Sequence, residues 1–313
     1  MTDLPPFAVI VVNFSSSALL RDHAASLDVV PPGRVIVVDC FSGAAERERV
    51  RDLAIERGWE CVLLDANEGF GGGTNAGAAR ALELGARVLV GLNPDATITP
   101  VALTSLVAAV AADPMLLASP RIVQSGGEPW FIGADLYLDD GIPRGARARE
   151  RFAGAERLEW ATGACFAISA ELWARLSGFD EEYFLYWEDI DLSHRAIAAG
   201  ARLELVDAEV VHDQGGTHAE RRSSRAKSEL YYYYNIRNRM LYAVKHLAND
   251  DVRRWARSSA RIGYAVLLRG GRRQLVASWR PWRGYLRGLR DGRRIVRAHR
   301  RTAARAHEHA GRR

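Results

Sequence analysis

The chain has 313 residues, of which 48% are apolar and 26% are charged, and this composition excludes a largely disordered protein. Its length allows one large α/β domain with a smaller attachment, and no apolar run reaches the roughly 18 residues of a membrane-spanning helix. The net charge of +5 divides into +16 for residues 251–313, which hold 19 arginines and three carboxylates, and −11 for residues 1–250.

The first third of the sequence alternates apolar runs with segments of helical spacing. Strands are predicted at 8–12, 34–38, 60–64, 87–92 and 115–119, and helices at 15–27, 44–57, 74–84 and 100–112. Continuous apolar strands between amphipathic helices predict a mainly parallel sheet that is covered on both faces. Ligands of such sheets bind beyond the carboxyl ends of the strands. Polar residues stand at four of these ends: Asn13, Asp39, 65–73 and 93–95.

The second half is less regular. Residues 121–160 predict a loop or a small antiparallel insertion, because glycine, proline and arginine are scattered through them. Further strands are predicted at 162–169 and 202–206, further helices at 170–176 and 189–199, and mostly helices from Lys227 onward. We therefore expect an α/β domain over residues 1–225 and a helical, arginine-rich extension over residues 226–313.

The stretch NEGFGGGTNAG (67–77) is dense in glycine ahead of the helix predicted to begin at Thr74. Such a turn lets backbone N–H groups approach an anion, and the helix N-terminus adds a favourable dipole. No GK[ST] follows, so the stretch is not a Walker A loop, and its place after the third strand fits a dinucleotide fingerprint poorly. The alternative is a flexible surface loop.

Two further stretches hold candidate metal ligands. GLNPDATI (91–98) places Asp95 just after a buried strand, where a carboxylate can hold a divalent ion against a diphosphate. The alternative is that Asp95 or Thr99 caps the following helix. In VVHDQGGTH (210–218), His212 follows an apolar run, so its imidazole either reaches a metal held elsewhere or is a hydrogen-bonded structural residue.

FDEEYFLYWEDIDLSHR (179–195) combines six carboxylates with five aromatic side chains. Glu188 and Asp189 fall near the start of a predicted helix, where negative charge is stabilised by roughly 0.3–1 kcal/mol. That explains one carboxylate but not the aromatic residues. A general base needs an ionised carboxylate that is partly shielded from water, and aromatic rings suit the apolar faces of sugars. A sugar-binding site would require both of these features.

These stretches occur in the order seen in family-2 glycosyltransferases. Their ordered series resembles the rhamnosyltransferase-like branch over roughly residues 7–245. The motifs are VIVVNF, VVDCFS, NEGFGGGTNAG, LNPD, TGACFAIS, GFDEEYFLYWEDIDLSHR, VVHDQGGTH and YYYYNIRNRM. The resemblance implies a GT-A fold and inverting transfer of a sugar, with rhamnose as the first expectation. The donor would be a dTDP- or UDP-sugar, and the acceptor a glycan or a lipid-linked glycan.

The resemblance also implies a role for each candidate residue. Asp189 is the expected catalytic base, and Asp95 and His212 are the expected ligands of Mg²⁺ or Mn²⁺. The nucleotide and the donor sugar are expected at Asn13, Asp39, Asn67, Gly69, Gly71, Gly72, Asn75, Asn93 and Asp95, and the acceptor at Tyr186, Trp187 and Glu188. Two positions depart from the family pattern. Cys40 stands where Asn is common, and Asn93 replaces a carboxylate, which predicts a weakly held metal.

Two other functions compete with this one. A sugar-phosphate nucleotidyltransferase has a related fold, but its glycine-rich basic loop after the first strand has no counterpart in NFSSSALL (13–20). A non-enzymatic anion- or nucleic-acid-binding protein would use the arginine-rich tail, but RRM and zinc-finger motifs are absent. A nucleic-acid partner is therefore not expected.

The tail predicts peripheral attachment to the cytoplasmic face of a membrane. The first residues lack a secretory signal, so a cytoplasmic protein is expected. Trp and Tyr favour the membrane–water interface, and Arg pairs with anionic headgroups. The aromatic residues of the tail are Trp255, Tyr264, Trp279, Trp282 and Tyr285. The alternative is a pair of basic helices that pack on the acidic body.

Overall fold

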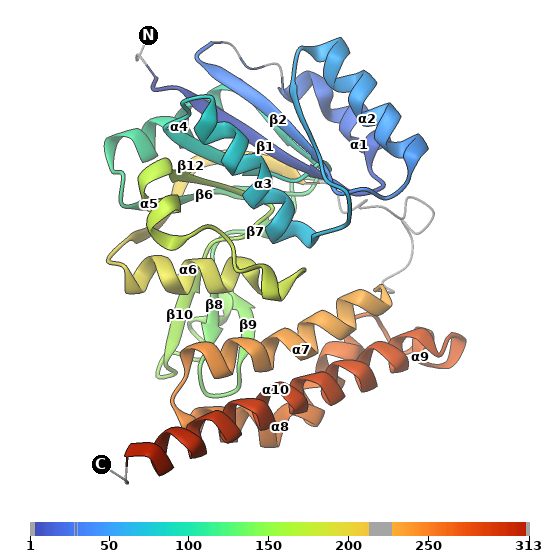
Figure 1. The fold of residues 1–313 in the computed structure, drawn as a ribbon, viewed down its shortest axis with the longest axis vertical. Coiled ribbons are helices and arrows are strands. Elements are labelled where there is room, and N and C mark those ends of the chain that lie inside the picture. The colour runs from blue at the N-terminus through green and yellow to red at the C-terminus, as the bar shows by residue number, and fades with distance from the viewer. Residues whose placement is uncertain (1–3, 28, 30, 213–226, 311–313) are drawn as a thin grey trace.

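The computed structural model describes residues 4–27, 29, 31–212 and 227–310. Within these residues an α/β body holds a nine-stranded sheet, and the C-terminal helices form a bundle beside it (Figure 1). Helix α6 (Glu188–Ala198) lies between the sheet and this bundle (Figure 1). The mixed sheet with helices on both sides confirms the predicted α/β class.

The strands of the body alternate with helices as far as Leu92, and several strands then follow one another directly. They are β1 (Phe7–Asn13), β2 (Gly33–Asp39), β3 (Glu60–Leu63), β4 (Val88–Leu92), β5 (Ala96–Ile98), β6 (Leu116–Val123), β7 (Pro129–Phe131), β8 (Ala134–Tyr137), β9 (Ile142–Gly145), β10 (Arg157–Trp160), β11 (Cys165–Ser169) and β12 (Arg202–His212). The other helices are α1 (Ser17–His23), α2 (Ala44–Arg57), α3 (Gly69–Glu83), α4 (Pro100–Ala112), α5 (Ala170–Leu176), α7 (Glu229–His246), α8 (Asn249–Leu268), α9 (Arg273–Ala277) and α10 (Arg280–Ala310). The short 3₁₀ helices are η1 (Ala24–Leu27), η2 (Ala146–Ala148) and η3 (Glu181–Tyr183).

The strand order of the main sheet is β3-β2-β1-β4-β11-β6-β12-β5, with β7 on the side of β6. Strands β3, β2, β1 and β4 run parallel, as predicted. Strand β11 runs antiparallel to both of its neighbours, β4 and β6, so the second half of the sheet is mixed. The sequence could not show this direction, because β11 is buried along its whole length and reads as a continuous apolar run like the parallel strands.

Residues 121–160 were predicted to form either a loop or a small antiparallel insertion, and the structure confirms the insertion. After β7, a separate three-stranded antiparallel sheet has the order β10-β8-β9. Strand β12 extends to His212, six residues beyond its predicted end at Val206, because pairing with β6 resumes after an irregularity between Val206 and Glu209. His212 consequently lies at the end of a strand.

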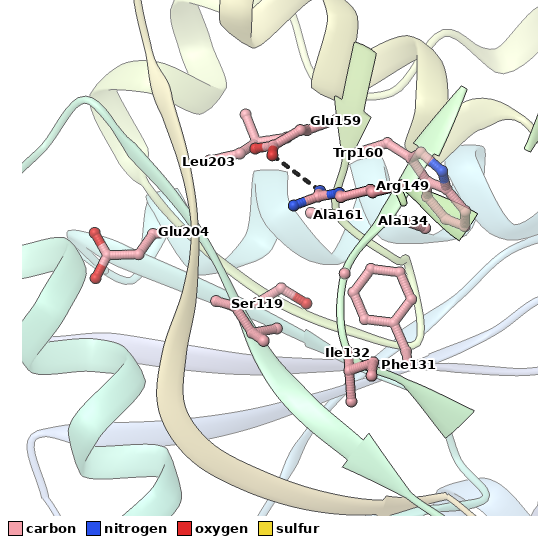
Figure 2. Close-up of a pocket in the computed structure, with 12 residues that line it drawn as sticks. Ser119, Phe131, Ile132, Ala134, Arg149, Glu159, Trp160, Ala161, Leu203 and Glu204 are labelled. Carbon is pink, nitrogen blue, oxygen red and sulfur yellow. Dashed lines mark hydrogen bonds and ion pairs between the residues drawn. The ribbon is translucent and has the colours of Figure 1, made fainter. Parts of the chain in front are cut away.

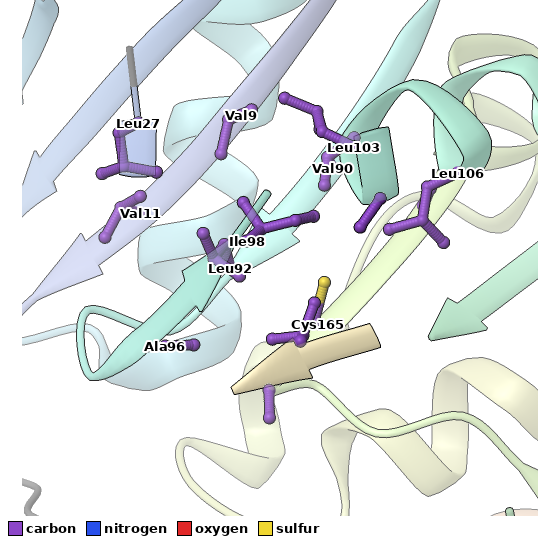
Figure 3. Packing of buried hydrophobic residues seen from close by; sticks show 14 of the residues in the cluster. Val9, Val11, Leu27, Val90, Leu92, Ala96, Ile98, Leu103, Leu106 and Cys165 are labelled. Carbon is purple, nitrogen blue, oxygen red and sulfur yellow. The ribbon is translucent and has the colours of Figure 1, made fainter. Parts of the chain in front are cut away.

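The core occupies both faces of the sheet. Alternate residues of β1 divide between the faces, with Val9 and Val11 on one side and Ala8 and Ile10 on the other. On the first side, Val9 and Val11 pack with residues of β4, β5 and α4, as Figure 3 shows for Leu92, Ile98, Leu103 and Leu106. The central strands are therefore fixed from both faces, and their ends are held in register.

The helical bundle shares a core with the body. Trp187 from the body packs with Tyr242 of α7 and Trp255 of α8. Arg239 of α7 is buried, donates to the backbone oxygens of Asp140 (2.6 Å) and Gly141 (3.3 Å), and lies 4.7 Å from the centre of the Trp255 ring. Helix α8, which begins the tail, thus packs on the body through Trp255, as the packing alternative predicted. In the described part of the chain, no helix is both long and apolar enough to cross a membrane.

Candidate active site

The ends of β1 and β2 bring two predicted residues together. Asn13 pairs with Asp39 in the ladder, and both side chains are fully buried. Asn13 Nδ2 lies 3.5 Å from Asp39 Oδ1, and Arg47 Nε donates to Asp39 Oδ2 at 2.9 Å. The Arg47 guanidinium also lies 4.5 Å from the centre of the Phe41 ring, which is 39% exposed. Arg47 was not identified from the sequence, because it lies in the first turn of helix α2, eight residues after Asp39, rather than at the strand end.

A second cluster joins the ends of β4 and β12. His212 Nε2 lies 3.2 Å from Asp95 Oδ1 and 3.4 Å from Asn93 Nδ2. Asp95 and His212 are both buried, and Trp130 from β7 stacks on the imidazole with 4.5 Å between the ring centres. The Nδ1 atom of His212 has no partner in the described residues. His212 is therefore in contact with Asp95 and Asn93, although more than about 100 residues separate it from them in the sequence.

The capping alternative applies to Thr99 rather than to Asp95. Thr99 Oγ1 accepts a hydrogen bond from Ala102 N at 3.2 Å and caps α4, which begins at Pro100. Asp95 is therefore not needed as a cap, and its carboxylate faces His212. Residues 213–218 of the histidine motif lie outside the described residues.

The Asp95–His212 pair fits a divalent cation. Two neighbouring donors around a six-coordinate Mg²⁺, each about 2.1 Å from it, lie about 3 Å apart, close to the 3.2 Å between Asp95 Oδ1 and His212 Nε2. Across the described ranges, no group of three or more His, Cys, Asp and Glu side chains could hold a metal. A cation at this position would need further ligands from a diphosphate and water, consistent with the weak holding that Asn93 predicts.

The predicted base lies in the first turn of α6. Asp189 Oδ2 accepts a hydrogen bond from Gly163 N at 3.1 Å, and Oδ1 accepts one from Ile190 N at 2.9 Å. Burial raises the pKa of Asp189 to about 6, although these backbone N–H groups oppose the shift. Glu188 is 5% exposed, and its Oε2 has no partner in the described residues. Burial and the charge of Asp189 raise the pKa of Glu188 well above its usual value.

Residues 163 and 164 connect Asp189 to the cluster of Asn93, Asp95 and His212. Gly163 N donates to Asp189, and the next residue, Ala164, accepts a hydrogen bond from Asn93 N at 2.9 Å. A Cβ at position 163 would lie 3.0 Å from the Phe70 ring and 3.7 Å from Asp189 Cβ. The glycine therefore lets the chain pass between α3 and α6. The motif TGACFAIS contains Gly163, but no role for Gly163 could be predicted from it, because the contact of this residue is made by its backbone N–H.

A strained turn precedes the base. Phe184, Tyr186 and Trp187 all have positive φ angles, of 63°, 63° and 78°. Such angles are costly for bulky residues and persist only where the surroundings hold them. Asn238 of α7 supplies that hold: its Nδ2 lies 2.8 Å, 3.0 Å and 2.7 Å from the backbone oxygens of Tyr183, Leu185 and Tyr186. Positions 183–187 are called the catalytic turn below.

The glycine-rich stretch packs against this turn and is helical. Helix α3 begins at Gly69, five residues before the predicted start at Thr74. A Cβ at Gly69 would lie 2.0 Å from the Phe184 oxygen, and one at Gly73 would lie 2.7 Å from Cys40 Sγ. Tertiary packing therefore requires the glycines and overrides their poor helix propensity. The flexible-loop alternative is wrong, because this stretch is buried and regular.

Gly71 and Gly72 also lie in the buried first turns of α3. A Cβ would lie 3.2 Å from Phe179 Cβ at Gly71 and 2.8 Å from Glu68 Cβ at Gly72. Asn67 lies just before the helix, where its Oδ1 accepts a hydrogen bond from Gly69 N at 2.9 Å. The expected donor loop is therefore a preformed helix start rather than a mobile loop.

Two predicted contacts with substrate are replaced by structural ones. Asn75 exchanges hydrogen bonds with the backbone of Phe179, at 2.9 Å in each direction, and donates to Glu181 Oε1, so its amide is already engaged within the protein. Trp187 is 3% exposed and belongs to the core shared with the bundle. The order of the aromatic residues in the stretch 179–195 does not reveal which ring faces the core. Tyr186 is half-buried, 5.3 Å from the Tyr231 ring, and remains a candidate.

A cavity lies apart from the candidate site residues described above. It has a volume of about 210 Å³ and lies between the insertion and the main sheet, where Arg149 pairs with Glu159 at 2.9 Å (Figure 2). Ser119, Phe131 and Trp160 also line it (Figure 2). It contains none of the candidate site residues, so the sequence-predicted site and this cavity are distinct.

Glu188→Gln is expected to raise the melting temperature in alkaline buffer and to change it little in acid. The folded protein raises the pKa of this carboxyl, so its ionisation costs stability once the pH exceeds the unfolded value. Glutamine removes that cost only where glutamate would ionise. Melting curves at both pH values test this, with Glu171→Gln, an exposed glutamate in the first turn of α5, as the control. A similar gain in both variants would contradict the burial argument.

Asn238→Leu is expected to lower kcat by about 10–10²-fold and the free energy of unfolding by about 1–3 kcal/mol. Leucine cannot hold the three oxygens of the catalytic turn, so the base moves with the released backbone. Asn235→Leu is the matched control, because Asn235 is on the same helix and donates to the Tyr231 oxygen one turn before it. Equal losses of activity in both variants would exclude a specific role for Asn238.

No family model matches the chain, but curated proteins are similar to it along most of its length. The chain is 24% identical over 274 residues to the low-salt glycan biosynthesis hexosyltransferase Agl10 of Haloferax volcanii, covering 85% of this chain and 82% of that protein. It is 28% identical over 239 residues to the N-acetylglucosaminyl-diphospho-decaprenol L-rhamnosyltransferase of Mycobacterium tuberculosis, covering 68% and 76%.

The fold agrees as well. The mannosyltransferase PcManGT from Pyrobaculum calidifontis, solved with GDP-Man and Mn²⁺, matches 94% of this chain and 86% of its own with a TM-score of 0.53 at 16% identity. The sequence relatives are glycosyltransferases, and the solved neighbour shares the sheet and helix arrangement predicted from the motifs. The chain is therefore a glycosyltransferase of the GT-A fold, with a rhamnosyltransferase among its relatives.

Proposed function

We propose that this glycosyltransferase belongs to family 2 and transfers a sugar with inversion from a nucleoside-diphosphate sugar to an acceptor hydroxyl. One observation carries the proposal: a shielded carboxylate with a raised pKa, Asp189, is joined through residues 163 and 164 to the cluster of Asn93, Asp95 and His212. A base and a diphosphate site are the two parts that such a transfer needs. The name of the Mycobacterium tuberculosis relative supports rhamnose as the first sugar to test and a lipid-linked glycan as the acceptor. The choice of dTDP as its nucleotide rests on the resemblance of the motifs alone.

The nucleotide is proposed to bind over the ends of β1 and β2. Asp39 is the proposed contact for the base of the nucleotide, and its weak 3.5 Å contact with Asn13 leaves Oδ1 free to accept a stronger hydrogen bond. Arg47 pairs with this carboxylate at 2.9 Å and orients it. The start of α3, with Asn67 before it and Gly69, Gly71 and Gly72 within it, provides a positive helix end for the diphosphate.

Asp95 and His212 would hold Mg²⁺ or Mn²⁺, with Asn93 beside them. The bound ion would neutralise negative charge on the diphosphate of the donor. Within the protein, Trp130 fixes the plane of the His212 ring, and the contact with His212 fixes the Asp95 carboxylate. These contacts orient the two donors before a nucleotide arrives.

Asp189 is proposed to take the proton of the acceptor hydroxyl. The acceptor oxygen forms a bond to the anomeric carbon while the bond from that carbon to the phosphate oxygen breaks. The nucleoside diphosphate leaves with the electron pair, and a single displacement inverts the anomeric configuration. A pKa of about 6 makes Asp189 a stronger base than an exposed aspartate, yet leaves it ionised at neutral pH. Gly163 N holds Oδ2 in place.

The acceptor is proposed to lie beside the catalytic turn. The Oε2 atom of Glu188 has no partner in the described residues, so it can form a hydrogen bond with a hydroxyl of the acceptor. It can donate as well as accept in that bond, because the raised pKa of Glu188 favours the protonated carboxyl. The half-buried Tyr186 offers a ring edge next to it. Trp187 is left out of this site, since its ring is buried in the core.

The test is a panel of nucleotide sugars incubated with the full chain, with and without Mn²⁺. We expect release of nucleoside diphosphate from one donor class, dTDP-rhamnose first, and a product of opposite anomeric configuration by NMR. A product with retained configuration would overturn the inverting mechanism. Pyrophosphate release from a nucleoside triphosphate and a sugar phosphate would instead indicate a nucleotidyltransferase.

A further inference from the structure

Only part of the aromatic content of the tail reaches the surface. Trp255 is fully buried in the core shared with the body. Trp282 and Tyr285 are partly buried and pack within the bundle. Tyr264 and Trp279 are 44% and 64% exposed. The expected membrane contact therefore cannot be spread along the tail, and it has to be sought where exposed apolar side chains gather.

They gather at one end of the bundle. Val276 is 93% exposed, Leu286 is 49% exposed, and both flank Trp279 in the chain. The Tyr264 ring lies 6.3 Å from the Trp282 ring, which places it beside the same segment. Figure 1 shows α9 at the end of the bundle opposite the C-terminus, away from the sheet. The exposed residues Tyr264, Val276, Trp279 and Leu286, with Arg269, Arg272, Arg273 and Arg280, are called the α9 tip.

The α9 tip is held rigidly from its inner side. Gln274 is buried, accepts a hydrogen bond from the Tyr232 hydroxyl at 2.8 Å and donates to the Leu267 oxygen at 3.2 Å. Trp282 Nε1 donates to the Leu275 oxygen at 3.0 Å. Because residues 274 and 275 are fixed from within, the neighbouring Val276 remains at the surface in an ordered segment. A frayed end would not present it in this way.

The charge of the α9 tip is positive and uncompensated. Residues 269–280 contain four exposed arginines and no carboxylate. Arg272, Arg273 and Arg280 form no ion pair with any carboxylate that the structure describes. Further along α10 the arginines are paired within the bundle: Arg283 and Arg287 with Glu229, and Arg290 and Arg294 with Asp291. Free positive charge therefore surrounds the exposed apolar side chains.

We propose that the α9 tip docks on an anionic lipid bilayer. Val276 and Trp279 enter the headgroup layer, with Tyr264 and Leu286 at its edge, and the four arginines pair with lipid phosphates. Insertion of Trp and aliphatic side chains into this layer lowers the free energy. The aliphatic stems of the arginines lie along the layer and leave their charged groups among the phosphates. A nucleic acid would explain the arginines, but not an almost fully exposed valine, which offers no stacking surface. The inference is independent of the proposed transfer reaction.

The experiment compares the full chain with Val276→Ser/Trp279→Ser in sedimentation with vesicles of phosphatidylglycerol and phosphatidylcholine. The matched control is Val101→Ser/Ile55→Ser, because these apolar residues of the body are 76% and 73% exposed. We expect the tip variant to partition at least about tenfold more weakly, and the control to match the wild type. Rising salt should release the wild type, and pure phosphatidylcholine vesicles should not retain it.

A second variant isolates the charge. Arg272→Gln/Arg273→Gln is expected to weaken binding at low salt, whereas Arg51→Gln/Arg175→Gln, on exposed arginines of the body, is not. Equal vesicle binding by wild type and tip variant would overturn the proposal. Displacement of the vesicles by duplex DNA or RNA would assign the surface to nucleic acid instead. A wild-type dimer that the tip variant dissociates would assign it to a second copy of the chain. Nucleotide binding, measured in the same variants by calorimetry, reports on the transferase site separately.

Discussion

Asp189→Asn is expected to lower kcat by about 10²–10⁴-fold while the affinity for the nucleotide sugar stays near that of the wild type. Asparagine keeps the size of the side chain and can still accept the hydrogen bond from Gly163 N. It cannot take a proton from the acceptor hydroxyl. Product formation gives kcat, and calorimetry with the donor gives the affinity.

The pH profile adds an independent measure of the same role. Asp189 is active as a base only when it is ionised, and burial raises its pKa to about 6. The value of kcat/KM is therefore expected to fall as the pH drops through about 6, a limb that Asp189→Asn should lack. Glu182→Gln, in the same acidic stretch but exposed, is the control and should keep both rate and profile. Near-normal turnover in Asp189→Asn would remove this residue from the mechanism and make Glu188 the next candidate.

Asp95→Ala is expected to weaken Mn²⁺ binding in the presence of a nucleoside diphosphate by about 10²-fold, and to lower activity with it. With alanine the site keeps only His212 and the amide of Asn93. Electron paramagnetic resonance of Mn²⁺ measures the binding without relying on turnover. His212→Ala should behave in the same way, because its Nε2 is the second donor of the pair.

Thr99→Ala separates metal binding from helix capping. It removes the cap of α4 and is expected to cost about 1 kcal/mol of stability while leaving Mn²⁺ binding unchanged. If Asp95→Ala instead loses only stability, or if activity survives both that change and excess chelator, the metal hypothesis fails. Backbone donors and the α3 N-terminus would then have to stabilise the leaving group.

The parts of the fold that follow from local rules were predictable. Helices α2, α4 and α5 begin and end where the sequence places them, and α4 shows why: Thr99 caps it, and Pro100 suits the first helical position. The strand-end rule likewise placed Asn13 beside Asp39. The direction of β11 and the start of α3 could not be read. Both depend on contacts between distant segments, such as Gly69 against Phe184.

The candidate site shows the same division. Ionisable side chains at recognisable positions, such as Asp95, His212 and Asp189, could be named from the sequence, and the structure places Asp95 beside His212. The groups that orient them could not. Gly163 acts through its backbone N–H, and Asn238 acts across more than 50 residues of chain on three carbonyl oxygens.

The hold of Asn238 on the catalytic turn has a consequence for biosynthesis. A chain made from its N-terminus completes the sheet, Asp189 and the Asp95–His212 pair before α7 leaves the ribosome. Until then the turn lacks the amide that binds three of its carbonyl oxygens, and the hydrogen bond from Phe70 N to the Phe184 oxygen is left to oppose relaxation of the positive φ angles. The nascent enzyme is thus expected to remain silent while its body is already folded, and to acquire catalytic geometry only when the last helices close over it.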